Sequence, residues 1–113
     1  MIPTVAIESP FAGDVERNKK YLARCVADCL KRGESPYASH AFFTQFLDDN
    51  VPERRELGIE AGFAWSTKAD FFVFYCDYGI SNGMAEAFET VKERNKKYLI
   101  RYIGKNEDAD IVE

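Results

Sequence analysis

Two segments of this sequence place a hydroxyl side chain and a glycine just before a helix-like stretch, a combination typical of loops that bind anions. They are Ser9-Pro10-Phe11-Ala12-Gly13-Asp14 and Ser81-Asn82-Gly83-Met84. Backbone N–H groups at a helix N-terminus are free to bind a phosphate, and glycine lets a ligand approach the backbone closely. Neither segment is a Walker loop or a GxGxxG fingerprint. The competing interpretation is therefore an ordinary turn with a helix cap at Asp14 or Ser81.

A third segment, residues 39–50, contains the only histidine of the chain, His40. The segment is long for a connection in a small domain, and long connections are often functional. Charged and polar side chains follow the histidine: Gln45, Asp48, Asp49, Arg54 and Arg55. A histidine near carboxylates and guanidiniums favours a polar binding pocket. The alternative is that Asp48 and Asp49 face water ahead of a helix whose dipole favours their charge.

The composition excludes several classes of protein. The chain has 113 residues, of which 46% are hydrophobic and 14% aromatic, enough for the core of one domain. Its net charge is −4 and its 15 basic residues are scattered, so a nucleic-acid polymer is not an expected partner. No run of about 18 apolar residues predicts a membrane span. The first residues, Met1-Ile2-Pro3-Thr4, lack the basic start of a signal peptide.

The cysteines fit a reducing environment better than a disulfide framework. Cys25, Cys29 and Cys76 give an odd count, so we expect a cytoplasmic protein, in the host cytoplasm if it is encoded by a phage. Cys25 and Cys29 would share one face of a helix, but His40 is the only histidine that could join them as a ligand. We expect the cysteines to be small buried residues, and we expect neither a metal nor a cofactor.

Short apolar runs alternate with stretches of helical periodicity along the chain. The runs predict strands near residues 3–8, 35–38, 70–76 and 97–103, and the third is nearly all apolar, as a strand covered on both faces must be. The periodic stretches predict helices from Val15 to Arg32, from Pro52 to about Ser66, and from Gly83 onward. We expect residues 40–50 to be a long connection. The acidic end of the chain, residues 105–113, is expected to be a tail after one domain of residues 1–104.

This alternation predicts an α/β fold with a parallel sheet of about four strands flanked by helices. The expected spatial order is 2-1-3-4, which puts the first and third strands in the middle. In such sheets ligands bind beyond the carboxyl ends of the strands. The three segments described above follow strand ends, so they are expected to meet at one site.

Together the motifs resemble one superfamily. They are Ser9-Pro10-Phe11 with Gly13 and Asn18, Pro36 with His40, Leu47-Asp48-Asp49 with Pro52 and Gly58, Asp70, and Ser81 with Gly83-Met84. Their order and spacing over residues 3–103 are similar to those of the nucleoside 2-deoxyribosyltransferase-like proteins, especially the short members found in phages and bacteria.

The resemblance implies a Rossmann-like, flavodoxin-type fold and a site for a nucleoside or nucleoside 5′-phosphate. It implies a dimer or larger homo-oligomer, in which a neighbour helps to close the site. The residues that we expect to line the pocket are Ser9, Pro10, Phe11, Gly13, Asn18, His40, Asp48, Ser81, Gly83 and Met84. The aromatic load of so short a chain also favours a homo-oligomer, most simply a dimer built on helix faces.

One position departs from the active relatives, in which a glutamate attacks the sugar C1′ and displaces the base. The resemblance places that nucleophile four residues after Gly83, where this chain has Ala87. Glu86 is adjacent, but a helix turns about 100° per residue, so Glu86 is expected to point away from the direction of Ala87. We therefore expect a protein that binds a nucleotide or nucleotide-derived molecule without cleaving it, for example to sequester a nucleotide signal. The alternatives are an N-glycosidase or deoxyribosyltransferase that uses Glu86, and an interaction domain without a small ligand.

Overall fold

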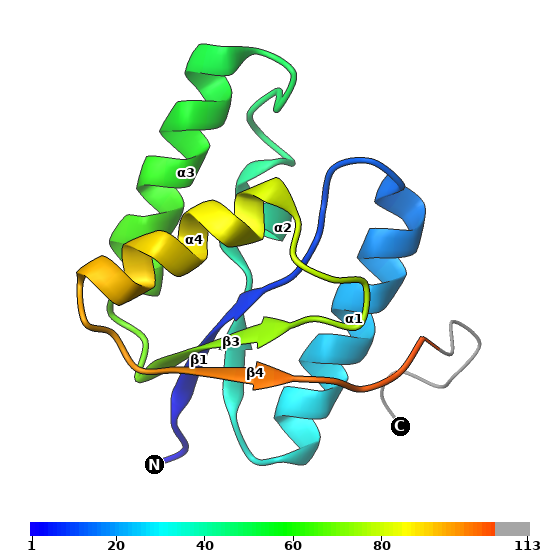
Figure 1. The fold of residues 1–113 in the computed structure, drawn as a ribbon, viewed down its shortest axis with the longest axis vertical. Coiled ribbons are helices and arrows are strands. Elements are labelled where there is room, and N and C mark those ends of the chain that lie inside the picture. Colours follow the sequence, from blue (N-terminus) through cyan, green and yellow to red (C-terminus); the bar gives the residue numbers. More distant parts are fainter. Residues whose placement is uncertain (106–113) are drawn as a thin grey trace.

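The structure, a computed structural model, describes residues 1–105 and is an α/β fold of the Rossmann-like kind. Four parallel strands are flanked by helices (Figure 1). The elements in chain order are β1 (Thr4–Glu8), α1 (Val15–Lys31), β2 (Ser35–Tyr37), α2 (Ser39–Phe43), α3 (Pro52–Ser66), β3 (Phe71–Tyr75), α4 (Asn82–Glu93) and β4 (Tyr98–Arg101). The predicted fold class is therefore confirmed, and the predicted tail lies almost wholly outside the described residues.

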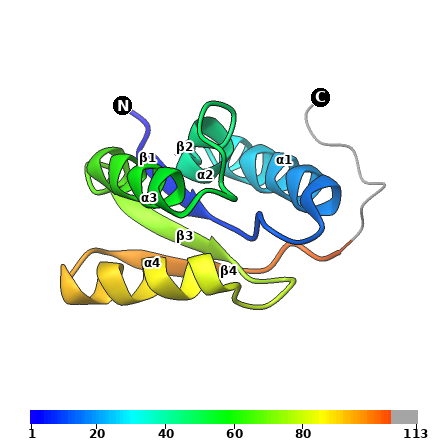
Figure 2. The same cartoon turned by 90° about the horizontal axis from the view of Figure 1, so that it is seen from above.

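The sheet has the predicted strand order, β2-β1-β3-β4, and every neighbouring pair is parallel. The central pair runs in register from Val5 opposite Phe71 to Glu8 opposite Phe74. A parallel pair needs a crossover between its strands, and helices on both faces of the sheet supply it. Figure 2 shows α1 and α4 on opposite sides of the sheet. The carboxyl ends of β1 and β3 consequently lie at the same edge.

The hydrophobic core has one layer on each face of the sheet, because alternate side chains of a strand point to opposite faces. The layer under α1 contains Val5, Ile7, Tyr21, Leu22, Cys25, Cys29, Val73 and Tyr75. The layer under α4 contains Ala6, Phe72, Phe74, Cys76, Met84, Ala87 and Val91, with Phe63 of α3 packed against it. All three cysteines are free and buried, as expected. The alternation places Glu8, which follows Ile7, on the α3 and α4 side.

Helices α1 and α3 begin at the predicted residues, Val15 and Pro52, and α4 begins at Asn82, one residue before the predicted Gly83. The carboxylate of Asp14 accepts a hydrogen bond from the Arg17 N–H at 3.1 Å, and the Ser81 hydroxyl accepts one from the Met84 N–H at 3.2 Å. Both are N-caps that satisfy a backbone donor of the first turn. Pro52 occupies the first turn of α3. These caps aim the N-termini of α1 and α4 toward the loops that follow β1 and β3.

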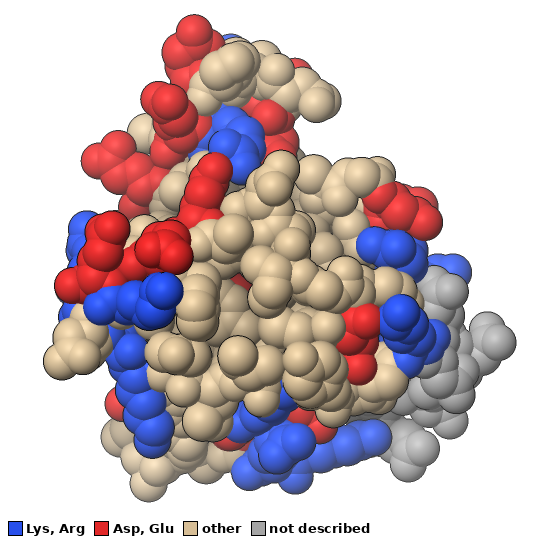
Figure 3. All heavy atoms as spheres, viewed as in Figure 1, with Lys and Arg blue, Asp and Glu red and all other residues tan. Residues whose placement is uncertain are grey.

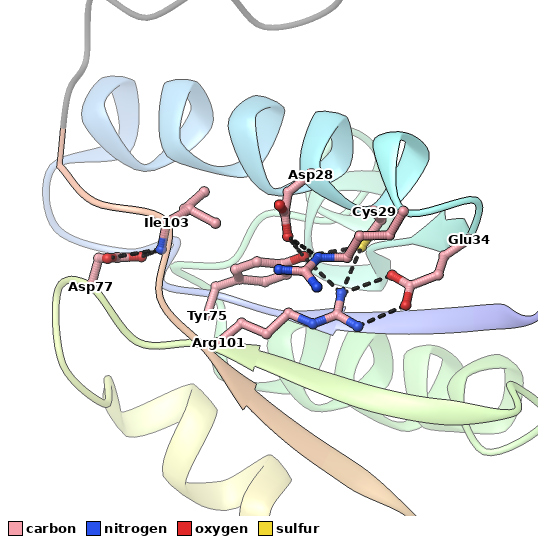
Figure 4. Close-up of polar contacts among 8 residues, drawn as sticks. Asp28, Cys29, Glu34, Tyr75, Asp77, Arg101 and Ile103 are labelled. Carbon is pink, nitrogen blue, oxygen red and sulfur yellow. Dashed lines mark hydrogen bonds and ion pairs between the residues drawn. The ribbon is translucent and has the colours of Figure 1, made fainter.

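A bidentate ion pair fixes the edge strand β4 to the turn after α1. The Arg101 guanidinium donates to both carboxylate oxygens of Glu34 at 2.7 Å, and both side chains are only 10% exposed (Figure 4). Arg101 also donates to the Tyr75 hydroxyl at 3.2 Å, and that hydroxyl donates to Asp28 at 2.8 Å. Hydrogen bonding to Arg101 holds the pKa of Glu34 below its ordinary value.

A second anchor is Asp77, directly after β3. Its carboxylate accepts a hydrogen bond from the Ile103 N–H at 2.9 Å (Figure 4) and another from the Gly104 N–H at 2.6 Å. The Tyr21 hydroxyl donates to the same group at 2.6 Å. Burial acts to raise the pKa of Asp77, but these donors outweigh it and the pKa lies below its ordinary value. The segment after β4 is therefore tied to the end of β3.

The segment expected to be a long connection contains a short helix, α2, which the sequence analysis missed. Its N-cap residue, Ala38, makes no side-chain cap, so the sequence carries no start signal. The helix packs on α3 at two glycines. A Cβ on Gly62 would lie 2.7 Å from the Ser39 Oγ and 2.9 Å from the Ser39 Cβ, whereas one on Gly58 would lie 3.5 Å from Leu47. Gly62 is thus the point of closest approach between the two helices.

Several of the aromatic side chains invoked for an oligomer are exposed. Phe42, Phe46 and Trp65 are 48%, 69% and 65% exposed, whereas Phe43 and Phe63 are half-buried. On the face seen in Figure 3, acidic side chains gather over α3 and α4, and basic side chains lie in separate groups. The predicted homo-oligomer stays a prediction.

Within residues 1–105, none of the helices has the length and apolar character needed to cross a bilayer.

We expect Gly62→Ala to destabilise the protein by about 1–3 kcal/mol, because the added methyl group overlaps the backbone-proximal Ser39 Cβ. The matched change Gly58→Ala should be neutral or stabilising by up to about 1 kcal/mol, since it gains helix propensity and meets only an ordinary contact. Urea denaturation of both variants measures the difference. Equal stability of the two variants would contradict the close approach of α3 to α2.

Candidate functional site

A cavity of about 460 Å³ opens at the carboxyl edge of the sheet, where β1 and β3 end. The loop after β1 forms one side of the cavity, α2 and α3 form another, and the first two turns of α4 close a third. The topology requires this position, because the loops that leave the central strands of a parallel sheet diverge there. The volume lies within the usual range of small-molecule sites, roughly 300–1,000 Å³.

The carboxyl of Glu8 forms part of the floor of the cavity. Glu8 is the last residue of β1 and its side chain faces the cavity from the α4 side of the sheet. Among residues 1–105, no group donates a hydrogen bond to this carboxyl or pairs with it as an ion. Desolvation by the surrounding protein raises the pKa of Glu8 to about 8. The group is therefore mostly a neutral acid at pH 7.

Beside Glu8, the Ser9 hydroxyl and the His40 ring form a hydrogen bond. The Ser9 Oγ lies 2.9 Å from the His40 Nε2. Burial lowers the pKa of His40 to about 4, so the imidazole is neutral at pH 7. Its Nδ1 is buried and has no partner among the described residues. The direction of the Ser9–His40 hydrogen bond depends on the imidazole tautomer: with the proton on Nε2, His40 donates to Ser9 and the hydroxyl hydrogen is free for a ligand.

Charged groups lie at the mouth of the cavity. Arg54 and Arg55, in the first turn of α3, both line it, and Asp49 precedes them. The Arg55 guanidinium lies 3.9 Å from the Glu86 carboxylate, and the two side chains are 38% and 58% exposed. An exposed pair of this kind contributes little to stability. Its guanidinium can therefore exchange this partner for a ligand anion at small cost.

Apolar side chains form the remaining walls. Phe11 follows β1 and contacts His40 edge-on, with 6.2 Å between ring centroids. Met84, at the start of α4, is buried and also lines the cavity. The wall is completed by residues of α2, α3 and the segment between them: Phe43, Leu47, Ile59 and Phe63. Flat apolar surfaces around a few polar groups suit a ring-containing ligand.

The structure brings most of the predicted site residues together around this cavity. Those that line it are Ser9, Phe11, Gly13, His40, Ser81, Gly83, Met84 and Glu86. Ala87 lines it as well, although it belongs to the buried stripe of α4. Glu86 and Ala87 therefore both line the cavity, but Glu86 is exposed whereas Ala87 is buried. Their roles in binding or chemistry stay predictions.

Three predicted residues lie outside the lining. Asn18 is buried and donates from its amide to the carbonyl oxygens of Phe11 and Ala12 at 2.9 and 3.1 Å, so it supports the loop after β1. Asp48 is exposed and accepts a hydrogen bond from the Asn50 N–H at 2.9 Å in a local turn. Pro10 is buried behind its loop.

The most important residue that the sequence analysis missed is Glu8. A signal for it exists: a glutamate directly after the apolar run Val5-Ala6-Ile7 must lie at the end of a buried strand. The sequence analysis named Arg54 and Arg55 among the charged side chains of a possible polar pocket, and both line the cavity. The lining residues Ile59 and Phe63 of α3 carry no signal, since their positions depend on how α3 packs.

No group of three or more histidine, cysteine, aspartate and glutamate side chains in the described part of the chain is arranged to hold a metal ion. In a comparison with known families, the model described as a domain of unknown function, DUF7768, matches residues 3–102. The chain belongs to this family. The DUF7768 match spans β1 to β4 and so contains every residue that lines the cavity. Searches of curated proteins and of solved structures found no match.

The stability of this DUF7768 protein should fall as pH rises from about 6.5 to 8. In this window the unfolded chain has released the Glu8 proton, because its pKa there is near 4.5, while the folded protein still holds it. His40 acts in the opposite direction, but only between pH about 4 and 6.5, where the unfolded chain alone is protonated. We expect a loss on the order of 2 kcal/mol, limited because the carboxyl faces an open cavity.

Glu8→Gln removes this titration, so its free energy of unfolding should be nearly flat over the same window. Urea denaturation at several pH values measures both proteins. Parallel curves for wild type and Glu8→Gln between pH 6.5 and 8 would contradict the burial of the Glu8 carboxyl.

Proposed function

We propose that the cavity binds a nucleoside or a nucleoside 5′-phosphate. The observation that carries this proposal is the combination, in one cavity, of apolar walls, neutral polar groups on the floor and two arginines at the mouth. A nucleotide has the matching distribution of chemistry: a flat base, a sugar with hydroxyl groups and an anion at one end. The resemblance to nucleoside 2-deoxyribosyltransferase-like proteins points to the same ligand class.

Two features of the mouth suit a phosphate. The guanidiniums of Arg54 and Arg55 can donate to its oxygens, and within residues 1–105 the ion-pair partner of Arg55 is the exposed Glu86. The first residues of α4, Asn82 and Gly83, also line the cavity. The Ser81 cap bonds the Met84 N–H, so the N–H groups of the two preceding residues remain free in the first turn.

We further propose that the ligand is held without cleavage. Attack on the sugar C1′ needs a free carboxylate aimed at that carbon. The position where the active relatives are expected to carry it is Ala87, which has no nucleophilic atom and is 3% exposed. Retention of a bound nucleotide would suit a protein that sequesters a nucleotide signal.

One observation favours a second function, an N-glycosidase or deoxyribosyltransferase. Glu86 lines the same cavity as Ala87, so a carboxylate is present close to the expected nucleophile position. Its contact with Arg55 at 3.9 Å draws this carboxylate toward the mouth of the cavity. The two functions differ in one measurable respect, the release of free base.

We expect at least one nucleoside monophosphate in a panel of ribo- and deoxyribonucleotides to raise the melting temperature by several degrees. Ligand at about 100 times its Kd stabilises a folded protein by roughly 2.7 kcal/mol. We expect no free base in the same samples, measured by chromatography after overnight incubation. Inorganic phosphate and ribose 5-phosphate serve as controls for binding that does not involve the base.

Base release by the wild-type protein would contradict binding without cleavage. If Glu86→Ala then abolished that release while the melting-temperature shift persisted, the enzyme with Glu86 as nucleophile would replace the binding function. If no nucleoside or nucleotide changed the melting temperature, the proposed ligand class would be wrong.

Gly83→Ala should weaken the binding of a nucleoside monophosphate about tenfold, equivalent to ~1.4 kcal/mol. A Cβ at this position meets no protein atom within 4 Å, so it takes space at the start of α4 that a phosphate would occupy. The fold should tolerate the change, because helix propensity improves by up to about 1 kcal/mol. Isothermal titration calorimetry measures the affinity. Unchanged affinity would place the phosphate away from this helix terminus.

A further inference from the structure

The Glu8 carboxyl is half-buried and lines the cavity, and it has no partner among the described residues. Strand β1 ends with Glu8 opposite Phe74 of β3, and the neighbouring side chains on this face are those of the apolar layer under α4. Within residues 1–105, no hydrogen bond and no ion pair reaches the carboxyl oxygens. A polar group that is largely shielded from water and has no protein partner can gain a hydrogen bond from a ligand that enters the cavity.

The titratable groups that face the cavity from the other elements do not neutralise Glu8. His40 of α2 is neutral near pH 7 and bonded to Ser9. The guanidiniums of Arg54 and Arg55 on α3 form no ion pair with Glu8 within 4.0 Å. The other charged groups that line the cavity, Asp49 before α3 and Glu86 on α4, are carboxylates and cannot neutralise an acid. Desolvation alone raises the pKa of Glu8 to about 8, so the acid keeps its proton near neutral pH.

We propose that Glu8 donates a hydrogen bond from its protonated carboxyl to an uncharged acceptor of the ligand, and that the Ser9–His40 pair binds the polar group next to that acceptor. This inference rests on the proposed nucleotide-binding function and adds the orientation and the pH dependence of binding. A protonated carboxyl has one O–H donor, and Ser9 has a rotatable hydroxyl. The floor of the cavity is therefore a subsite for a neutral donor–acceptor group.

The same floor rejects a phosphate. An environment that disfavours the charge of a carboxylate also disfavours any other unpaired anion placed there. The arginines that can balance a phosphate lie at the mouth, where Arg55 is 38% exposed. The ligand consequently enters with its neutral part first and its phosphate outermost.

Two parts of a nucleotide have the chemistry that the floor requires. A base presents ring nitrogen or carbonyl acceptors beside N–H donors, and the sugar presents neighbouring hydroxyl groups. Adenosine, adenosine 5′-phosphate and ribose 5-phosphate separate the two possibilities, because the first lacks the phosphate and the last lacks the base.

The test measures Kd for these three probes by isothermal titration calorimetry at pH 7 and pH 9. Above pH 7 a phosphate monoester is already almost fully ionised, since its second pKa is about 6. For the probe part that contacts Glu8, wild-type affinity should fall about tenfold from pH 7 to pH 9, because a group with a pKa of about 8 loses most of its protonated form. A loss shown by adenosine but not by ribose 5-phosphate places the base on the floor, whereas a loss shown by ribose 5-phosphate as well places the sugar there.

Three variants sharpen the test, each checked for folding by circular dichroism. Glu8→Gln keeps a neutral donor of similar shape, so binding at pH 7 should stay within about threefold of wild type and its pH dependence should vanish. Glu8→Leu removes the donor and should weaken binding about tenfold at pH 7. Glu60→Gln is the matched control, since Glu60 is exposed on α3 and does not line the cavity, and it should keep the wild-type pH profile.

Binding that is equally tight at pH 7 and pH 9 for every probe would overturn this inference while leaving the proposed function intact. A pH dependence that persists in Glu8→Gln would overturn it too, because another group would then be responsible. Absence of binding by all three probes at both pH values would contradict the proposed function itself, and this inference with it.

Discussion

The pairing of β1 with β3 sets the position and the chemistry of everything else at the carboxyl edge of the sheet. From the Val5–Phe71 pair to the Glu8–Phe74 pair, the backbone N–H and C=O groups of the two strands form hydrogen bonds with each other, and helices cover both faces of the sheet. Because the strands are parallel and in register, they end together. Beyond these strand ends the backbone no longer forms strand-to-strand hydrogen bonds and continues as loops. At this edge the loops therefore lie close to the caps of α1 and α4 and to the side chain of Glu8.

Burial at the ends of these strands has an electrostatic result. Glu8 and His40 have pKa values that move in opposite directions, to about 8 and about 4, and both shifts favour the neutral form near pH 7. The charges of this region are thereby confined to the mouth, on Arg55, Glu86 and their neighbours. The floor of the cavity therefore carries neutral polar groups, while the charged groups lie at its mouth. The proposed orientation of the ligand depends on this separation.

Local sequence signals predict those strands and helix caps that depend on interactions between residues close together in the chain. The apolar run Phe71–Tyr75 and the caps at Asp14 and Ser81 lie where the sequence places them, because burial and capping leave marks on neighbouring residues. Helix α2 leaves no such mark, since packing against Gly62 of α3 holds it in place. Glu8 was overlooked because its importance comes from desolvation, which depends on segments far away in the sequence.

Helix α3 provides a large share of the cavity wall but buries very little of itself. Only Gly62 and Ser66 are buried in its fifteen residues, and its main neighbour is the short helix α2. Separation of such a helix from the sheet exposes little apolar surface, so it costs only a fraction of the free energy of global unfolding. Backbone amides of α3 should exchange with solvent deuterium before those of α1, whose side chains fill the core. Movements of α3 away from the sheet would therefore change the volume of the cavity. A ligand that contacts both α4 and α3 would restrict these movements and so reduce the range of cavity volumes.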